Sequence, residues 1–162
     1  MNIKKIVSII LVVIWMSVIF GFSNQQEKES SNASRKVCEI IVDVVNIVNK
    51  YTDIEKENII NILEPFVRKI AHYTIYLAGG ILISNCVYQF QKNIKKSAFI
   101  SLIIGIMYAI CDELHQLMVA GRSGRVIDVI IDSLGIMTGV VIFLLLKQIC
   151  KKVANEKNKI RG

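Results

Sequence analysis

The sequence has little of what usually marks the active site of a soluble enzyme. Only one proline and two histidines occur in 162 residues, so a histidine-rich metal site is excluded. The four cysteines are scattered and contain no CxxC pair, which excludes a thiolate zinc site and a disulfide scaffold. There is no glycine-rich phosphate-binding loop, no HExxH pair and no serine-centred nucleophile motif. The enzyme classes that these motifs identify are therefore excluded.

Long apolar segments separated by charged connectors dominate what is present. The chain is 53% hydrophobic and 20% charged, with a mean hydropathy of +0.50. A helix needs roughly 20 apolar residues to cross about 30 Å of hydrocarbon. Four segments approach this length, so we expect an all-α integral membrane bundle of four transmembrane helices, forming a single domain over 1–162. The predicted helices cover about 4–22, 66–88, 97–118 and 125–148.

The first two apolar segments have distinct beginnings. Lys4 and Lys5 precede the first one, as in a signal peptide, but the apolar run is long and no clear small-x-small cleavage site follows at 21–25. We therefore expect a retained membrane anchor. Pro65 lies just before the second segment, where a proline can begin a helix without breaking one.

The long connector 23–65 is more than a tether. Its apolar residues recur at the spacing of an amphipathic helix: Val37, Ile40, Ile41, Val44, Val45, Ile47 and Val48. Ser34 is the expected cap of this helix, and Asp53 that of a short helix at 54–63. The polar face is mixed to acidic rather than lysine-rich, so packing onto the bundle and lying on the membrane surface both remain open.

The distribution of lysine and arginine predicts the orientation, because cytoplasmic connectors hold the excess of basic residues. One side of the predicted bundle carries Lys4, Lys5, Lys92, Lys95, Lys96, Lys147, Lys151, Lys152, Lys157, Lys159 and Arg161. Both termini, including the tail 149–162, are therefore expected in the cytoplasm, and the connector 23–65 outside. The net charge of +7 follows this pattern, so no nucleic-acid partner is expected.

Polar residues gather at the predicted outer ends of the last three helices, in stripes at helical spacing. The stripes and the loop before the fourth helix make up the predicted ligand-binding site: Arg68, His72, Tyr76, Asp112, Glu113, His115, Gln116, Arg122, Arg125, Asp128 and Asp132. Ionisable groups at membrane depth normally face the bundle interior and pair with one another. We therefore expect the arginines to pair with the carboxylates.

This site permits several kinds of chemistry. Arginine forks bind an anion such as a lipid phosphate or a carboxylate. A histidine oriented by a carboxylate can act as a general acid or base, and the candidate catalytic residues are His72, Asp112, Glu113 and His115. A metal bound by His72 and His115 is the least favoured alternative, and no cofactor is expected. Alternatively, the same groups hold the bundle together, assisted by close packing at Gly135 and Gly139.

Four segments of the chain resemble the VanZ-like family. They are residues 22–25 (FSxQ), 68–76 (RKIAHYxxY), 112–116 (DELHQ) and 121–139 (GRxGRxxDxxxDxxGxxxG). The resemblance covers most of the chain in the right order and leaves 26–60 loosely defined. Some family members have Asn where this chain has Asp132, and the added charge favours pairing with Arg125 or Arg68.

The resemblance implies a four-helix, multi-pass protein of the bacterial cytoplasmic membrane. The founding member is associated with low-level resistance to teicoplanin, a lipid-tailed glycopeptide that acts on cell-wall precursors. The expected ligand is a lipid head group, a wall precursor or the lipoglycopeptide itself, which the site would bind or modify. The alternative is a structural or partner protein without enzymatic activity, and a homo-oligomer is compatible with either reading.

Overall fold

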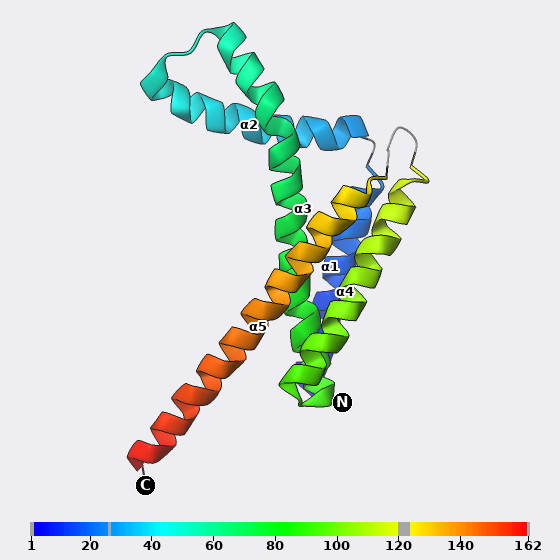
Figure 1. Cartoon of the computed structure of the whole chain (residues 1–162), viewed down its shortest axis with the longest axis vertical. Helices are drawn as coiled ribbons and strands as arrows, with labels where there is room; N and C mark the ends of the chain where they lie inside the picture. The colour runs from blue at the N-terminus through cyan, green and yellow to red at the C-terminus, as the bar shows by residue number, and fades with distance from the viewer. Residues whose placement is uncertain (1, 26, 120–123, 162) are drawn as a thin grey trace.

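The computed structural model describes residues 2–25, 27–119 and 124–161, without the side chains of 27–30, 48–49 and 158–161. These residues form five helices and no strand: α1 (Ile3–Ser23), α2 (Glu27–Asn49), α3 (Asp53–Gln91), α4 (Ile94–Gln116) and α5 (Val126–Arg161). All except α2 are long and apolar enough to cross a membrane, which confirms the predicted all-α membrane bundle. The start of α1 and the end of α5 lie at one end of the molecule (Figure 1). The opposite end carries α2, and we name it the α2 end.

Three of the helices, α1, α3 and α4, begin at polar side chains that satisfy their first amides. Asn2 accepts a hydrogen bond from the amide of Lys4 at the start of α1, and Asn93 accepts one from the amide of Lys96 at the start of α4. Thr52 and Glu55 form a capping box at the start of α3. Lys92, in the left-handed conformation with φ 54°, ends α3 and allows α4 to begin almost at once.

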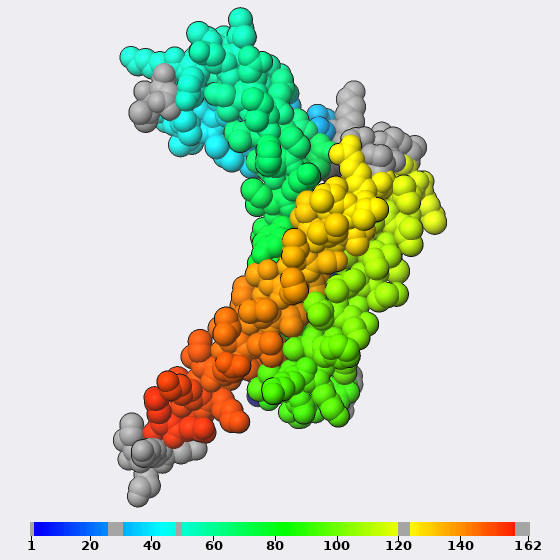
Figure 2. Space-filling model, in the orientation of Figure 1, coloured from blue at the N-terminus to red at the C-terminus, as the bar shows by residue number. Residues whose placement is uncertain are grey.

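The predicted start of the second transmembrane helix is wrong. Pro65 lies inside α3 rather than at its beginning, and the predicted short helix 54–63 is the first part of α3, with Thr52 instead of Asp53 as its cap. A proline within a helix removes one hydrogen bond, here to the carbonyl of Asn61. Packing of α2 against Leu63 and Val67, on either side of Pro65, offsets the loss. With 39 residues α3 is roughly 58 Å long, well beyond the hydrocarbon thickness. Its start projects from the bundle (Figure 2).

Two further boundaries differ from the predictions. The predicted amphipathic helix is confirmed as α2, but it begins at Glu27, so Ser34 is a buried residue within it and not its cap. The predicted tail 149–162 continues α5 as a helix to Arg161. No proline or glycine interrupts this segment before Gly162, and its Lys, Ala and Glu residues favour a helix.

Close contact between α3 and α5 dominates the packing, and α3 also contacts the other three helices. A Cβ atom added to Gly139 would lie 2.1 Å from the carbonyl oxygen of Leu77, and one added to Gly80 would lie 2.3 Å from that of Ile136. Gly135 likewise faces the carbonyl oxygen of Tyr73. The predicted close packing at Gly135 and Gly139 is therefore confirmed, because only glycine allows these backbones to meet.

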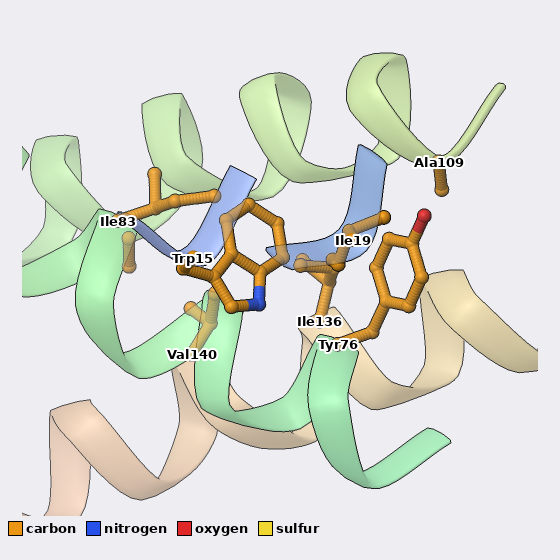
Figure 3. Close-up of a cluster of buried hydrophobic side chains, with 8 residues drawn as sticks. Trp15, Ile19, Tyr76, Ile83, Ala109, Ile136 and Val140 are labelled. Atoms are coloured by element: carbon orange, nitrogen blue, oxygen red, sulfur yellow. The ribbon is translucent and has the colours of Figure 1, made fainter. Parts of the chain in front are cut away.

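The apolar core lies where the four long helices meet (Figure 3). Its buried members are Trp15, Ile19, Tyr76, Ile83, Ala98, Ala109, Ile136 and Val140. A second, smaller cluster joins α2 to α3 through Cys38, Val42 and Ile60. Thus α2 is packed against the start of α3 and does not hang free from the bundle.

Candidate functional site

The predicted polar stripes meet at the α2 end of the bundle. Tyr76 on α3, Asp112 on α4 and Asp132 on α5 are all buried there. Each comes from a helix that is apolar along most of its length, so these polar groups face inward as membrane depth requires. The site is therefore built from three membrane-spanning helices, and α1 adds Ser23 at its last residue.

Asp112 is the centre of the polar network. Its carboxylate accepts hydrogen bonds from the hydroxyl of Ser23, from the hydroxyl of Tyr76 at 2.9 Å and from the side-chain amide of Gln116 at 3.0 Å. The amide of Gln116 also reaches the Ser23 hydroxyl at 3.4 Å. One side chain thus joins α1, α3 and α4. Removing a group that satisfies several buried donors is costly, because each is then desolvated without a partner.

Aromatic contacts with Trp15 and Tyr108 position the ring of Tyr76, and Figure 3 shows Trp15 and Tyr76 in the core. Trp15 meets Tyr76 edge to face at 5.9 Å between ring centroids, and its indole N–H donates to the carbonyl of Ile75 at 2.8 Å. Tyr108 packs against Trp15 at 5.1 Å and donates its hydroxyl to the carbonyl of Met16. Neither Trp15 nor Tyr108 belongs to a predicted stripe. The signal that would have placed Tyr108 at the site is its position four residues before Asp112 on one helix face.

His72 faces Asp132 across the contact between α3 and α5. The Nδ1 atom of His72 lies 3.6 Å from a carboxylate oxygen of Asp132, whose side chain is only 1% exposed. The expected pairing of Asp132 with Arg125 or Arg68 is wrong. Arg68 lies one turn nearer the α2 end and contacts Glu64 at 2.9 Å, while Arg125 is exposed at the start of α5. Asp132 therefore meets the histidine that lies at its own depth.

Glu113 and the start of α5 form a separate contact. A carboxylate oxygen of Glu113 accepts the backbone N–H of Arg125, so this buried acid satisfies the amide that precedes α5. The other oxygen of Glu113 has no hydrogen-bond partner within the described part of the chain. Asp128 is half-buried one turn further along, and Arg122 lies outside the described residues. The expected ion pairs between Arg125 and these carboxylates are absent from the residues that the structure describes.

The two histidines have different surroundings. His115 lies 2.9 Å from the side-chain oxygen of Asn24 and stacks on Phe20 with 4.8 Å between ring centroids. Its partners are thus on α1, whereas His72 faces α5. Among the residues that the structure describes, no three His, Cys, Asp or Glu side chains are grouped to hold a metal ion. The geometry gives the metal alternative for His72 and His115 no support.

A cavity of about 170 Å³ opens beside the polar network. Arg68, His72, Asp112 and Ser23 contribute polar groups to its lining. The rest of the lining is mostly apolar and comes from α1, α2 and α3: Ile19, Phe22, Ala33, Ala71, Ile75 and the ring of Tyr76, together with Ser34 and Gln25. The sequence pattern placed Arg68, His72, Tyr76 and Asp112 together, but not the walls that α1 and α2 supply.

The family model described as VanZ/LLP1 matches residues 8–147 of the chain, which include the whole site. The resemblance expected from the four sequence motifs is thereby confirmed. Comparison with curated proteins and with solved structures gives no match.

Proposed function

Because the chain belongs to the VanZ/LLP1 family of membrane proteins, we propose that its cavity binds an amphipathic anion and thereby contributes to low-level resistance to teicoplanin or related lipoglycopeptides. The ligand is a lipid head group, a cell-wall precursor or the antibiotic itself. These molecules share one chemistry, an anionic phosphate or carboxylate next to an apolar chain. The protein acts at the bacterial cytoplasmic membrane, with both termini in the cytoplasm and the α2 end outside.

The mixed lining of the cavity is the observation that carries this proposal. Arg68 and His72 supply polar groups to the lining, whereas Ile19, Phe22 and Ile75 supply apolar surface. A ligand with one charged group and one apolar chain matches both parts. A fully polar solute would leave the apolar walls in contact with water, and a fully apolar one would desolvate Arg68 without replacing its solvation.

Arg68 is the residue suited to the anion. Its guanidinium offers a planar set of N–H donors that matches phosphate and carboxylate equally well. The contact with Glu64 uses one terminal nitrogen and holds the side chain beside the cavity. We therefore propose that Glu64 positions Arg68 and that its guanidinium binds the anion.

His72 is the best candidate for any chemical step. Asp132 faces one ring nitrogen of His72, an arrangement that orients an imidazole for proton transfer. The other predicted catalytic candidates have structural partners: Asp112 accepts three hydrogen bonds, Glu113 accepts the amide that precedes α5, and His115 lies against α1. Binding is the proposed activity, and modification of the ligand would depend on His72.

The second candidate function is that of a structural or partner protein without enzymatic activity. One observation favours it, namely that Asp112 joins three helices through satisfied hydrogen bonds. In that case the polar cluster stabilises the bundle and the cavity takes no ligand. The two functions differ in the expected effect of replacing Arg68, because Arg68 is not part of the hydrogen-bond network around Asp112.

A resistance assay separates the two functions. Arg68→Gln should abolish teicoplanin resistance in a bacterial host at an unchanged protein level, because it removes the anion-binding charge and leaves the hydrogen bonds of Asp112 in place. The matched control is Arg35→Gln, which removes an arginine of α2 that contacts Glu57 outside the cavity. Retained resistance in Arg68→Gln, or an equal loss in both variants, would contradict the proposal.

A further inference from the structure

An apolar stripe on α2 is left uncovered by the residues that the structure describes. Its members are spaced three or four residues apart and therefore share one helix face. The stripe consists of Val37, Ile40, Val44 and Ile47, whose exposed fractions range from 46% to 79%. Exposed apolar surface of this extent on one helix face marks an interaction site.

A different face of α2 packs against α3. Ser34, Cys38 and Val42, again four residues apart, are buried there, and Cys38 and Val42 cluster with Ile60 of α3. Burial raises the pKa of the Cys38 thiol, as expected for this apolar contact. The residue that starts the exposed stripe, Val37, is one position from Cys38 and so points about 100° away from the packed face. The stripe therefore needs a covering surface other than α3.

The contacts of α2 show which way the stripe points. On its polar side Arg35 contacts Glu57, and Asp43 contacts Lys56, near the start of α3. The Glu57 carboxylate raises the pKa of the Arg35 guanidinium. On the other side Ala33, which is four residues before Val37, lines the cavity.

The cavity lies well down the long axis of α3 from these ion pairs. Its lining residues on α3 begin at Arg68, whereas the ion pairs are at Lys56 and Glu57. The difference of at least 11 positions is roughly 16 Å along a helix. The polar side of α2 thus points away from the membrane-spanning part of the bundle, and the apolar stripe points toward it.

Figure 1 shows α2 lying across the α2 end, at a steep angle to the long helices and extending past α3. Phe66 and Ile70 follow on α3 just after Ile60, where α2 packs. Both are exposed apolar residues of a spanning helix. The stripe on α2 therefore adjoins the surface that the bilayer covers.

We propose that α2 is an interfacial helix, docked on the bilayer leaflet at the α2 end with its stripe Val37, Ile40, Val44 and Ile47 among the acyl chains. The occupant is lipid hydrocarbon, because the stripe faces along the bundle toward the membrane and continues its apolar surface. Anionic lipid is not required. Arg35 is already paired with Glu39 and Glu57, and Lys56 with Asp43, and Lys36 is the exposed cation beside the stripe, so we expect apolar contact to supply most of the docking. This inference is independent of the proposed ligand.

The test uses a tryptophan placed on either side of α2 in the full chain. Val44→Trp and Ile40→Trp report on the stripe, and Glu39→Trp is the matched control at nearly the same position along the helix. Each variant is reconstituted in phosphatidylcholine vesicles, with or without bromine on the acyl chains near the head group. The wild-type chain supplies the background of the buried Trp15. Aqueous iodide on both sides of the membrane gives the complementary measurement.

The expected result is a blue-shifted emission from Val44→Trp and Ile40→Trp that is lost in brominated lipid and unaffected by iodide. Glu39→Trp should emit at longer wavelength, lose intensity with iodide and keep it in brominated lipid. Quenching of Val44→Trp and Ile40→Trp by iodide instead would overturn the proposal in favour of a water-facing stripe. Protection of both from bromine and iodide would overturn it in favour of a protein partner or a second copy. A melting transition equal to that of the wild type establishes that each variant is folded.

Discussion

At the scale of single residues, the site combines a carboxylate that accepts three hydrogen bonds with two basic side chains that line the cavity. Asp112 accepts three hydrogen bonds, and Tyr76 owes its position to the aromatic contacts of Trp15 and Tyr108. Arg68 and His72 line the cavity, and each is close to a carboxylate: Glu64 for Arg68 and Asp132 for His72. This division assigns stability mainly to Asp112 and ligand binding mainly to Arg68.

Replacing Asp112 should therefore destabilise the bundle. Asp112→Ala leaves the hydroxyls of Ser23 and Tyr76 and the amide of Gln116 without their acceptor, so we expect a loss of about 2–4 kcal/mol in the free energy of unfolding. Asp112→Asn keeps one acceptor oxygen and should lose less. Thermal unfolding in detergent measures both.

Asp128→Ala is the control for this experiment. Asp128 is half-buried, and its side chain makes no hydrogen bond or ion pair with the residues that the structure describes. The melting temperature of Asp128→Ala should stay near that of the wild type. Equal destabilisation of Asp112→Ala and Asp128→Ala would show that the network around Asp112 contributes nothing specific.

At the scale of helices, the faces of each helix were predictable but their partners were not. Helical spacing placed Arg68, His72 and Tyr76 on one face of α3, and the structure keeps them there. The same spacing could not say that His72 meets Asp132, because that pairing depends on the depth at which α3 and α5 cross. The crossing in turn depends on the glycines, whose small size lets the backbones approach.

Glycine substitutions test this crossing. Gly139→Ala should reduce the melting temperature, because the new Cβ would lie 2.1 Å from the carbonyl oxygen of Leu77 and α5 would have to move away. The loss should exceed the gain of up to about 1 kcal/mol that alanine brings to a helix. The matched control is Gly21→Ala in α1, where nothing lies within 4 Å of the added Cβ. A Gly139→Ala protein at least as stable as Gly21→Ala would contradict this view of the α3–α5 contact.

At the scale of the whole molecule, the number of spanning helices followed from the lengths of the apolar segments. That the polar residues gather at one end of the bundle followed from their helical spacing. The position of α2 did not, because local pattern carries no information on long-range packing. For the same reason Pro65 was misleading: proline preferences describe an isolated helix, while α2 packs against Leu63 and Val67 on either side of Pro65. The cavity was likewise unpredictable, since α1, α2, α3 and α4 each supply part of its lining.

The central claim is that this cavity binds an amphipathic anion through Arg68. The most direct measurement is binding to the detergent-purified full chain by native mass spectrometry, with dihexanoyl phosphatidylglycerol, undecaprenyl diphosphate and teicoplanin as separate probes. The account predicts that at least one of them binds the wild-type chain and Arg35→Gln alike, and that Arg68→Gln loses this binding while keeping its melting temperature. Binding that is equal in Arg68→Gln and wild type, or no binding of any probe, would contradict it.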